Sequence, residues 1–210
     1  MRQSWPWMAL AVLGAYHGLN PGMGWLFAVA RGLQEQRRST VLRSLLPIAV
    51  GHEASIAVVV GLVAVAQLTI APTVMPLLTA AALVGFGLLS LWRRRSHPRG
   101  FGMRIGTLGL AIWSFLMSSA HGAGLMLVPL LLQLPVYGGG PHDARLLIGP
   151  FAPGILAASL HTTVMLLVMG TVAIVVYEKV GLGFLRRSWL NLDLIWAVTL
   201  VSAGVVTLFT

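Results

Sequence analysis

Four histidines within apolar sequence are the side chains of this chain best suited to chemistry. His17, His52, His121 and His161 each lie about ten to fifteen residues into an apolar stretch. At 1.5 Å per helical residue, this places them near the middle of a hydrocarbon core about 30 Å thick. Imidazole ligates borderline metal ions, forms hydrogen bonds and exchanges protons near neutral pH. Four imidazoles at one depth predict a single central polar cluster.

One acidic residue, Glu53, lies deep in an apolar stretch directly after His52. A charged residue at this depth costs roughly 2.5–3.5 kcal/mol on insertion scales, so it should face the bundle interior or a wet cavity. Successive helical residues point about 100° apart, so His52 and Glu53 could line one wide cavity. The predicted metal ligands are His17, His52, Glu53, His121 and His161. Further candidates for substrate contact are Asn20, Met23, Ser119 and Thr162, and no catalytic residue is predicted.

A structural role for these residues stays open. A histidine in a span can serve as an interhelical hydrogen-bond partner. Methionines often fill gaps in a core, and serine or threonine often bonds to its own helix. A shared functional site is favoured because several ionisable groups recur at one depth.

Residues 17–24 read HGLNPGMG and place helix breakers inside the first apolar stretch. Pro21 removes a backbone donor and clashes with the preceding turn. Irregular backbone at membrane depth is tolerated where it lines a cavity. The sequence therefore predicts a kinked or broken first helix whose freed backbone groups, with His17 and Asn20, face the substrate. Gly122 and Gly124 are instead predicted to allow close helix contact.

The composition indicates an all-α membrane protein. Of the 210 residues, 57% are hydrophobic and 9% are charged, whereas soluble domains carry about 25% charged residues. We predict one integral membrane domain over 1–210 with six transmembrane helices, covering 5–31, 40–66, 71–92, 106–133, 148–177 and 188–209. The chain has no cysteine, which excludes disulfides and thiolate sites. The first stretch is not expected to be a cleaved signal peptide, because residues 17–24 interrupt it.

Basic residues alternate between the predicted loops. The first, third and fifth loops are rich in arginine or lysine, and the second and fourth are poor. By the positive-inside rule, the rich loops are cytoplasmic and both termini lie outside. We expect a multi-pass protein of a bacterial cytoplasmic membrane. We therefore interpret the net charge of +9 as basic residues that set the membrane topology, and not as a sign of nucleic-acid binding. The sequence leaves a homo-oligomer open.

The two halves of the chain share a pattern that indicates an internal duplication. His17-Gly18 recurs as His121-Gly122, and His52 and His161 are each followed nine residues later by a glycine. With three spans in each half, the repeats 5–92 and 106–209 would have opposite orientations in the membrane. Such inverted repeats are typical of secondary transporters, which bind substrate near the midplane between the repeats.

At these motifs the chain resembles the LysE superfamily of six-helix transporters, most closely its NicO branch of nickel and cobalt transporters. That branch has a first-span pattern like H-A-L-E-P-D-H and a Gly-His-Ser element in the second span. This sequence has H-G-L-N-P-G-M at 17–23 and Gly51-His52-Glu53. The resemblance implies His17 and His52 as metal ligands. The family's acids fall on Asn20 and Gly22, and its second histidine falls on Met23.

The predicted function is secondary transport of a transition-metal cation of the nickel, cobalt, zinc or copper class, through a midplane histidine and glutamate site. The metal would be the substrate, and no tightly bound cofactor is expected. One alternative is export of a small organic solute with the histidines carrying protons. A membrane-embedded metal-dependent enzyme is the minor alternative, although His52-Glu53 lacks the H-E-x-x-H signature. A further alternative is a subunit or assembly factor whose helix bundle only binds a partner.

Overall fold

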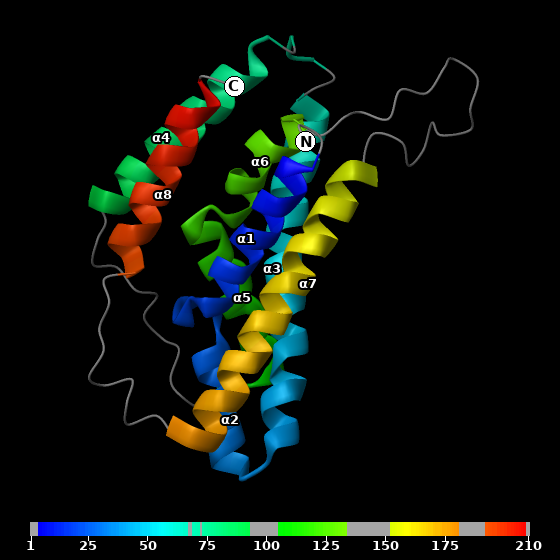
Figure 1. The fold of residues 1–210 in the computed structure, drawn as a ribbon, viewed down its shortest axis with the longest axis vertical. Helices are drawn as coiled ribbons and strands as arrows, with labels where there is room; N and C mark the ends of the chain where they lie inside the picture. Colours follow the sequence, from blue (N-terminus) through cyan, green and yellow to red (C-terminus); the bar gives the residue numbers. More distant parts are fainter. Residues whose placement is uncertain are drawn as a thin grey trace, which may run out of the picture.

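The computed structural model describes residues 4–66, 69–71, 73–92, 105–133, 152–180 and 192–208, and all regular structure within these ranges is helical (Figure 1). The helices are α1 (Trp5–Leu19), η1 (Pro21–Met23), α2 (Trp25–Glu35), α3 (Arg38–Ala66), α4 (Met75–Trp92), α5 (Thr107–His121), α6 (Ala123–Gln133), α7 (Ala152–Val175), η2 (Val176–Val180) and α8 (Leu192–Thr207). The all-helical expectation is confirmed for the described ranges.

The first apolar stretch is broken between α1 and α2, as its sequence predicts. Asn20 leaves the helical region, with φ −70° and ψ 116°, as the residue before a proline prefers. Pro21 then opens the 3₁₀ turn η1, and the side chain of Asn20 accepts a hydrogen bond of 2.9 Å from the N–H of Gly22. Gly24 ends the turn at φ 117°, a conformation that glycine adopts at little cost.

A second break corrects the prediction of one continuous helix over 106–133. Gly122 has φ 68° and caps α5, and α6 continues at an angle of 61° to α5. Gly122 was predicted as a close-contact glycine, but its role is conformational, because a left-handed residue is most readily a glycine. Gly124 does make a close contact, since an added Cβ there would lie 2.7 Å from Cβ of Val59.

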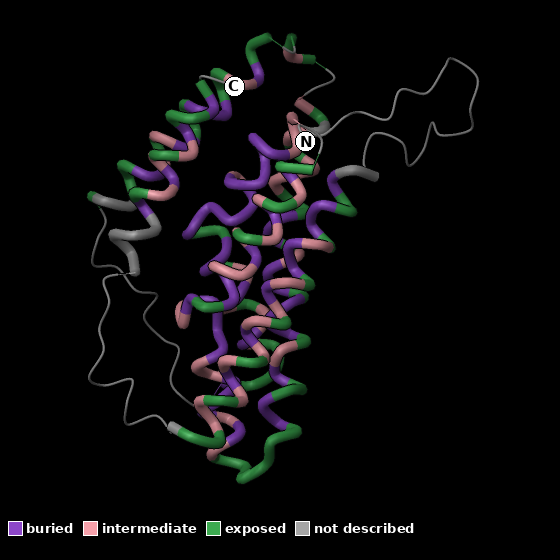
Figure 2. Tube along the Cα trace, in the orientation of Figure 1, coloured by how far each residue is buried: buried purple, intermediate pink, exposed green. Residues whose placement is uncertain are grey.

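Some of the described helices are long and apolar enough to cross a membrane. Within the described ranges these are α3, over Arg38–Val63, and α7, over Gly154–Lys179, and the bent pair α5 and α6 makes a third if it is one span. Exposed residues lie along the outside of the bundle (Figure 2), and many of them are leucine or valine. This outer surface suits contact with lipid more than with water.

The helices pack in pairs that join the two halves of the chain. α1 runs along α7, α3 runs along α5, and α4 runs along α8 (Figure 1). The core between the first two pairs contains fully buried residues such as Leu10, Ile48 and Met165. The α4 and α8 pair contacts the rest of the bundle mainly through α6, and Leu13 and Tyr16 of α1 also pack against it.

The contact between α4 and α8 is symmetric at the level of residues. A Cβ added to Gly87 would meet Val201 and the Ala197 carbonyl oxygen, at 2.8 and 3.2 Å. A Cβ added to Gly204 would meet Val84 and the Ala80 carbonyl oxygen, at 2.8 and 3.1 Å. Both helices therefore use the pattern A-x-x-L-V-x-x-G, at 80–87 and at 197–204. Each glycine packs on the alanine and valine of the other helix.

Candidate substrate-binding site

Three of the four predicted histidines meet in the centre of the bundle. His17 on α1, His52 on α3 and His161 on α7 are each fully buried. The ring centroids lie 4.8 Å apart for His17 and His161, 5.4 Å for His17 and His52, and 5.5 Å for His52 and His161. The structure thus brings together imidazoles from both halves of the chain. That any of them ligates a metal stays a prediction.

Close backbone contacts place these rings. A Cβ on Gly18 of α1 would lie 2.5 Å from the carbonyl oxygen of Met165 on α7, and one on Gly14 would overlap the carbonyl oxygen of His161. On the other side, a Cβ on Gly51 of α3 would overlap the carbonyl oxygen of Ala111 on α5. Glycine at these positions lets the helix backbones touch, so residues next to the contacts reach one another.

The Nδ1 atoms of all three rings have hydrogen-bond partners. His17 Nδ1 lies 2.8 Å from the carbonyl oxygen of Leu13, and His161 Nδ1 lies 3.2 Å from that of Leu10. A carbonyl only accepts, so in the neutral rings Nδ1–H donates and Nε2 carries a lone pair. The tautomer of two of the three rings is therefore set by backbone carbonyls of α1.

The third ring, His52, bonds through Nδ1 to the hydroxyl of Ser118 at 2.6 Å. The same hydroxyl lies 4.0 Å from the sulfur of Met23, toward which it donates. A thioether only accepts and a hydroxyl has one proton, so Ser118 then accepts from His52 Nδ1–H. This arrangement leaves a lone pair on Nε2 of His52 as well. Ser118 was not among the predicted site residues, although its place three residues before His121 was a usable signal.

Two ring nitrogens in the cluster have unmet hydrogen-bonding capacity. Nε2 of His52 and Nε2 of His161 are buried, and neither has a hydrogen-bond partner among the residues that the structure describes. The amide nitrogen of Asn20, a residue only 3% exposed, also has no hydrogen-bond partner among the described residues. A buried polar atom without a partner costs about 1–3 kcal/mol. Such a cost is expected where a ligand, ion or water completes the site.

The remaining predicted residues form hydrogen-bonded pairs between helices. Glu53 on α3 accepts a short hydrogen bond from the hydroxyl of Thr162 on α7. Ser119 on α5 bonds at 3.0 Å to Ser55 on α3. Within the described ranges, no set of three histidine, aspartate or glutamate side chains is arranged to hold a metal ion. That His17, His52, Glu53, His121 and His161 bind a metal stays a prediction.

His121 lies at the second break, which faces the first. It is the last residue of α5, and its Nδ1–H donates to the carbonyl oxygen of Met117 at 2.8 Å. A Cβ on Gly22 would lie 3.9 Å from Cε1 of His121, and the indole of Trp113 donates to the carbonyl oxygen of Gly22 at 3.1 Å. Residues of both breaks thus come together at one level of the bundle.

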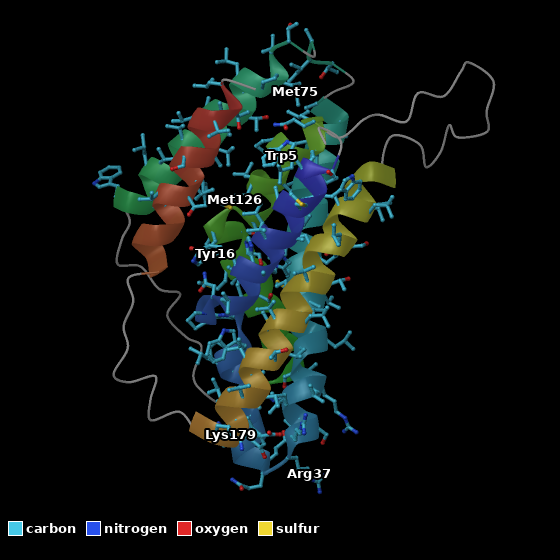
Figure 3. All side chains as sticks on the ribbon, in the orientation of Figure 1. Trp5, Tyr16, Arg37, Met75, Met126 and Lys179 are labelled. Atoms are coloured by element: carbon cyan, nitrogen blue, oxygen red, sulfur yellow. The ribbon has the colours of Figure 1, made fainter. Side chains whose placement is uncertain are left out.

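Charged residues lie at one end of the bundle. Arg37 and Lys179 lie at this end, opposite Trp5 and Met75 (Figure 3). Arg38 at the start of α3 forms an ion pair of 3.1 Å with Glu178 of η2. The start of α3 and the end of α7 are thereby joined at this end.

No family model matches the chain, and no curated protein or solved structure matches it either. The resemblance to the LysE superfamily stays a prediction that depends on the motifs at 17–23 and 51–53.

Proposed function

We propose that this chain is a secondary membrane transporter that moves a transition-metal cation through the cluster of His17, His52 and His161. The observation that carries the proposal is the meeting of three fully buried imidazoles from both halves of the chain. Intramembrane ionisable groups that face a bundle interior typically mark ion or proton pathways.

The proposed architecture has six spans in two inverted repeats. The spans are α1 with α2, α3, α4, α5 with α6, α7, and α8. The mirrored contact of Gly87 and Gly204 supports this arrangement, because a two-fold axis relating the halves would bring equivalent residues of α4 and α8 together. The pairing of His52 with His161, and of the next residues Glu53 and Thr162, supports the same axis between α3 and α7.

The two breaks support a binding site at the midplane. In inverted-repeat transporters, discontinuous helices place helix ends and freed backbone groups around the substrate. Here the first break contributes Asn20 and the second contributes His121, and the two meet at Gly22. We place the basic end with Arg37 and Lys179 in the cytoplasm, by the positive-inside rule.

The donor set favours a transition-metal cation over an alkali or alkaline-earth ion. Imidazole nitrogen suits zinc, copper, nickel and similar ions, whereas calcium and magnesium require oxygen ligands. Backbone carbonyls hold His17 and His161 in the tautomer that presents Nε2 lone pairs. Hydrogen bonds at the distal nitrogen orient metal-binding histidines in this way in many proteins.

A second candidate function is the export of a small organic solute with histidines as proton carriers. It is favoured by the absence, within the described residues, of three side chains arranged to hold a metal ion. The bond between Glu53 and Thr162 favours it as well, because the carboxylate is engaged away from the rings. In this case the unpaired nitrogens of His52, His161 and Asn20 would bond to the solute.

Flux measurements separate the two candidates. The purified chain in proteoliposomes with a metal-sensitive dye inside is expected to carry at least one of zinc, nickel, cobalt or copper. The variant His52→Gln, which keeps a polar side chain of similar size, is expected to lose most of this flux. If no metal enters the proteoliposomes but protons move with an added organic solute, the second candidate is supported and metal transport is ruled out.

A further inference from the structure

The histidine cluster lies between two apolar clusters, one on each side of it along the bundle. On α3, Ile48 lies about one turn before His52 and Ile56 lies about one turn after it. Both isoleucines are fully buried, and they belong to two different core clusters. The polar layer at His52 is therefore bordered by apolar packing on either side.

The helix α7 repeats this arrangement in the opposite direction. Met165, about one turn after His161, belongs to the cluster of Ile48, whereas Ala157, about one turn before His161, belongs to the cluster of Ile56. The helices α3 and α7 run antiparallel (Figure 1), so the two apolar clusters lie on opposite sides of the ring layer. Because the rings in this layer are fully buried, they are closed off from both ends of the bundle in this conformation.

Each apolar cluster includes one of the two short helices that follow the breaks. We call the cluster of Ile48 the α2 plug, because α2 contributes Ala28 and Val29 to it. We call the cluster of Ile56 the α6 plug, because α6 contributes Leu127 to it. The helix α2 lies toward one end of the bundle and α6 toward the other (Figure 1). Both pack against α3 and α7, the helices that carry His52 and His161.

Each of these short helices begins directly after a glycine with positive φ. Gly24 precedes α2 at φ 117°, and Gly122 precedes α6 at φ 68°. Among the described residues, no other glycine has a positive φ. Hinges are typically a few residues at the ends of elements that absorb changes in φ and ψ, and glycine has the widest backbone freedom. Both short helices are thus attached to the bundle at residues suited to rotation.

We propose that α2 and α6 are the two gates of the transporter, each hinged at the glycine before it, and that this conformation is the occluded state with both gates closed. The inference rests on the proposed transport function and names its moving parts. Rotation of α2 opens the α2 plug toward the end with Arg37 and Lys179, and rotation of α6 opens the α6 plug toward the end with Trp5 (Figure 3). The gates open in turn, because opening both would leave a continuous pore through the bundle.

Single hydrogen bonds link each gate to a neighbouring helix. Arg31 of α2 donates to the hydroxyl of Ser44 on α3 at 3.3 Å. Trp5 of α1 donates to the side-chain oxygen of Gln133, the last residue of α6, at 2.9 Å. A single hydrogen bond adds little net stability, so these contacts hold the gates closed without preventing their rotation.

Single cysteines test the two plugs, because the chain has no cysteine of its own. Ile48→Cys and Ile56→Cys are probed with a charged, membrane-impermeant thiosulfonate in right-side-out and inside-out membrane vesicles. We expect the two cysteines to react from opposite sides of the membrane, and reaction at either to abolish metal flux. The control is Val12→Cys, whose parent side chain is 68% exposed on the outside of α1, and it should react from neither side.

A second pair guards against misfolding of the isoleucine variants. Ala28→Cys in the α2 plug and Ala157→Cys in the α6 plug make a smaller change at fully buried positions. They should show the same opposite sidedness. Gel filtration and circular dichroism verify that each variant is folded.

A cross-link tests whether α6 itself moves. In Trp5→Cys with Gln133→Cys, a flexible bis-maleimide ties the end of α6 to α1. The linked chain should lose metal flux into proteoliposomes, and an added Ile56→Cys should no longer react, whereas an added Ile48→Cys should still react. The same double variant without the linker is the control and should carry metal. Undiminished flux through the linked chain overturns the α6 gate.

The outcomes separate this inference from the proposed function. Normal metal flux with both cysteines reacting from one side, from both sides, or not at all overturns the gates and leaves metal transport standing. Reaction from opposite sides in a chain that carries no metal overturns metal transport and leaves the gates to another solute.

Discussion

The two breaks in the bundle follow the same dipeptide but are built differently. After His17-Gly18 the helix continues to Leu19, and the break occupies Asn20 to Gly24 with a 3₁₀ turn. After His121 the break is a single residue, Gly122. Gly18 therefore remains helical and packs against α7, whereas Gly122 turns the chain at φ 68°.

This difference decides what each histidine can reach. His17 lies a few residues before the end of α1, on the surface that meets α7, and its ring contacts His52 and His161. His121 ends α5 and lies against the first break at Gly22. The dipeptide His-Gly thus has two outcomes. His17 belongs to the central cluster, whereas His121 lies where the two breaks meet.

Removing each histidine should give the largest contrast between the breaks. We expect His17→Ala to lower metal flux into proteoliposomes by about 10- to 100-fold, because His17 belongs to the proposed site and packs against His52 and His161. His121→Ala should have a much smaller effect. Uptake of metal into proteoliposomes containing a metal-sensitive dye measures both effects. Equal losses in the two variants would show that both breaks contribute ligands to one site.

Substituting alanine for the glycines after these histidines should destabilise the fold for different reasons. At Gly18 the reason is a steric clash. In Gly18→Ala the new Cβ meets backbone atoms of Met165 and Met169, at 2.5 and 3.0 Å. We expect a loss of about 1–3 kcal/mol in unfolding free energy, as for other overpacked contacts, together with lower metal flux into proteoliposomes. Gly61→Ala is the control, since its Cβ would meet nothing within 4 Å. A Gly18→Ala chain as stable as this control would contradict the close approach of α1 and α7.

At the second break, a substitution of Gly122 should lower stability through backbone strain. Gly122→Ala places a side chain at φ 68°, and the expected cost is about 1–2 kcal/mol. Gly122→Asn should cost less, because asparagine tolerates the left-handed region. Thermal unfolding of the two variants in detergent measures the difference. If the Gly122→Ala and Gly122→Asn variants are equally stable, the residue at this position is not left-handed.

The cap at the first break should give the smallest effect. Asn20→Ala removes the oxygen that accepts from the N–H of Gly22, and loss of such a cap typically costs about 1 kcal/mol. Asn20→Ser keeps an acceptor and should recover most of this stability. The melting temperatures of the three chains provide the comparison. If serine is no better than alanine, the cap does not stabilise the turn.

Part of this site could be predicted from residue types and their order. Pro21 and its neighbouring glycines predict the first break, because proline is incompatible with a helix interior. The second break was missed, since Gly122 stands without a proline, and a lone glycine in an apolar helix is as readily a packing residue as a turn. The mirrored contact of Gly87 and Gly204 was also missed, because small residues are common in apolar helices and do not reveal which helix they pack against.

The bond between Glu53 and Thr162 was not predictable from local pattern. Both residues were identified as candidates, but the sequence does not reveal which helix faces which. A hydrogen bond between them requires α3 and α7 to lie side by side at matching heights. That arrangement depends on packing between residues far apart in the chain.

The sequence by itself determined the apolar segments and the break at Pro21, because hydrophobicity and proline geometry act locally. The tertiary structure decided which histidines meet. His17, His52 and His161 come together because glycines at 14, 18 and 51 let the backbones of α1 and α7, and of α3 and α5, touch. Contacts of this kind depend on the complementary shapes of two surfaces, and these exist only once the helices have packed.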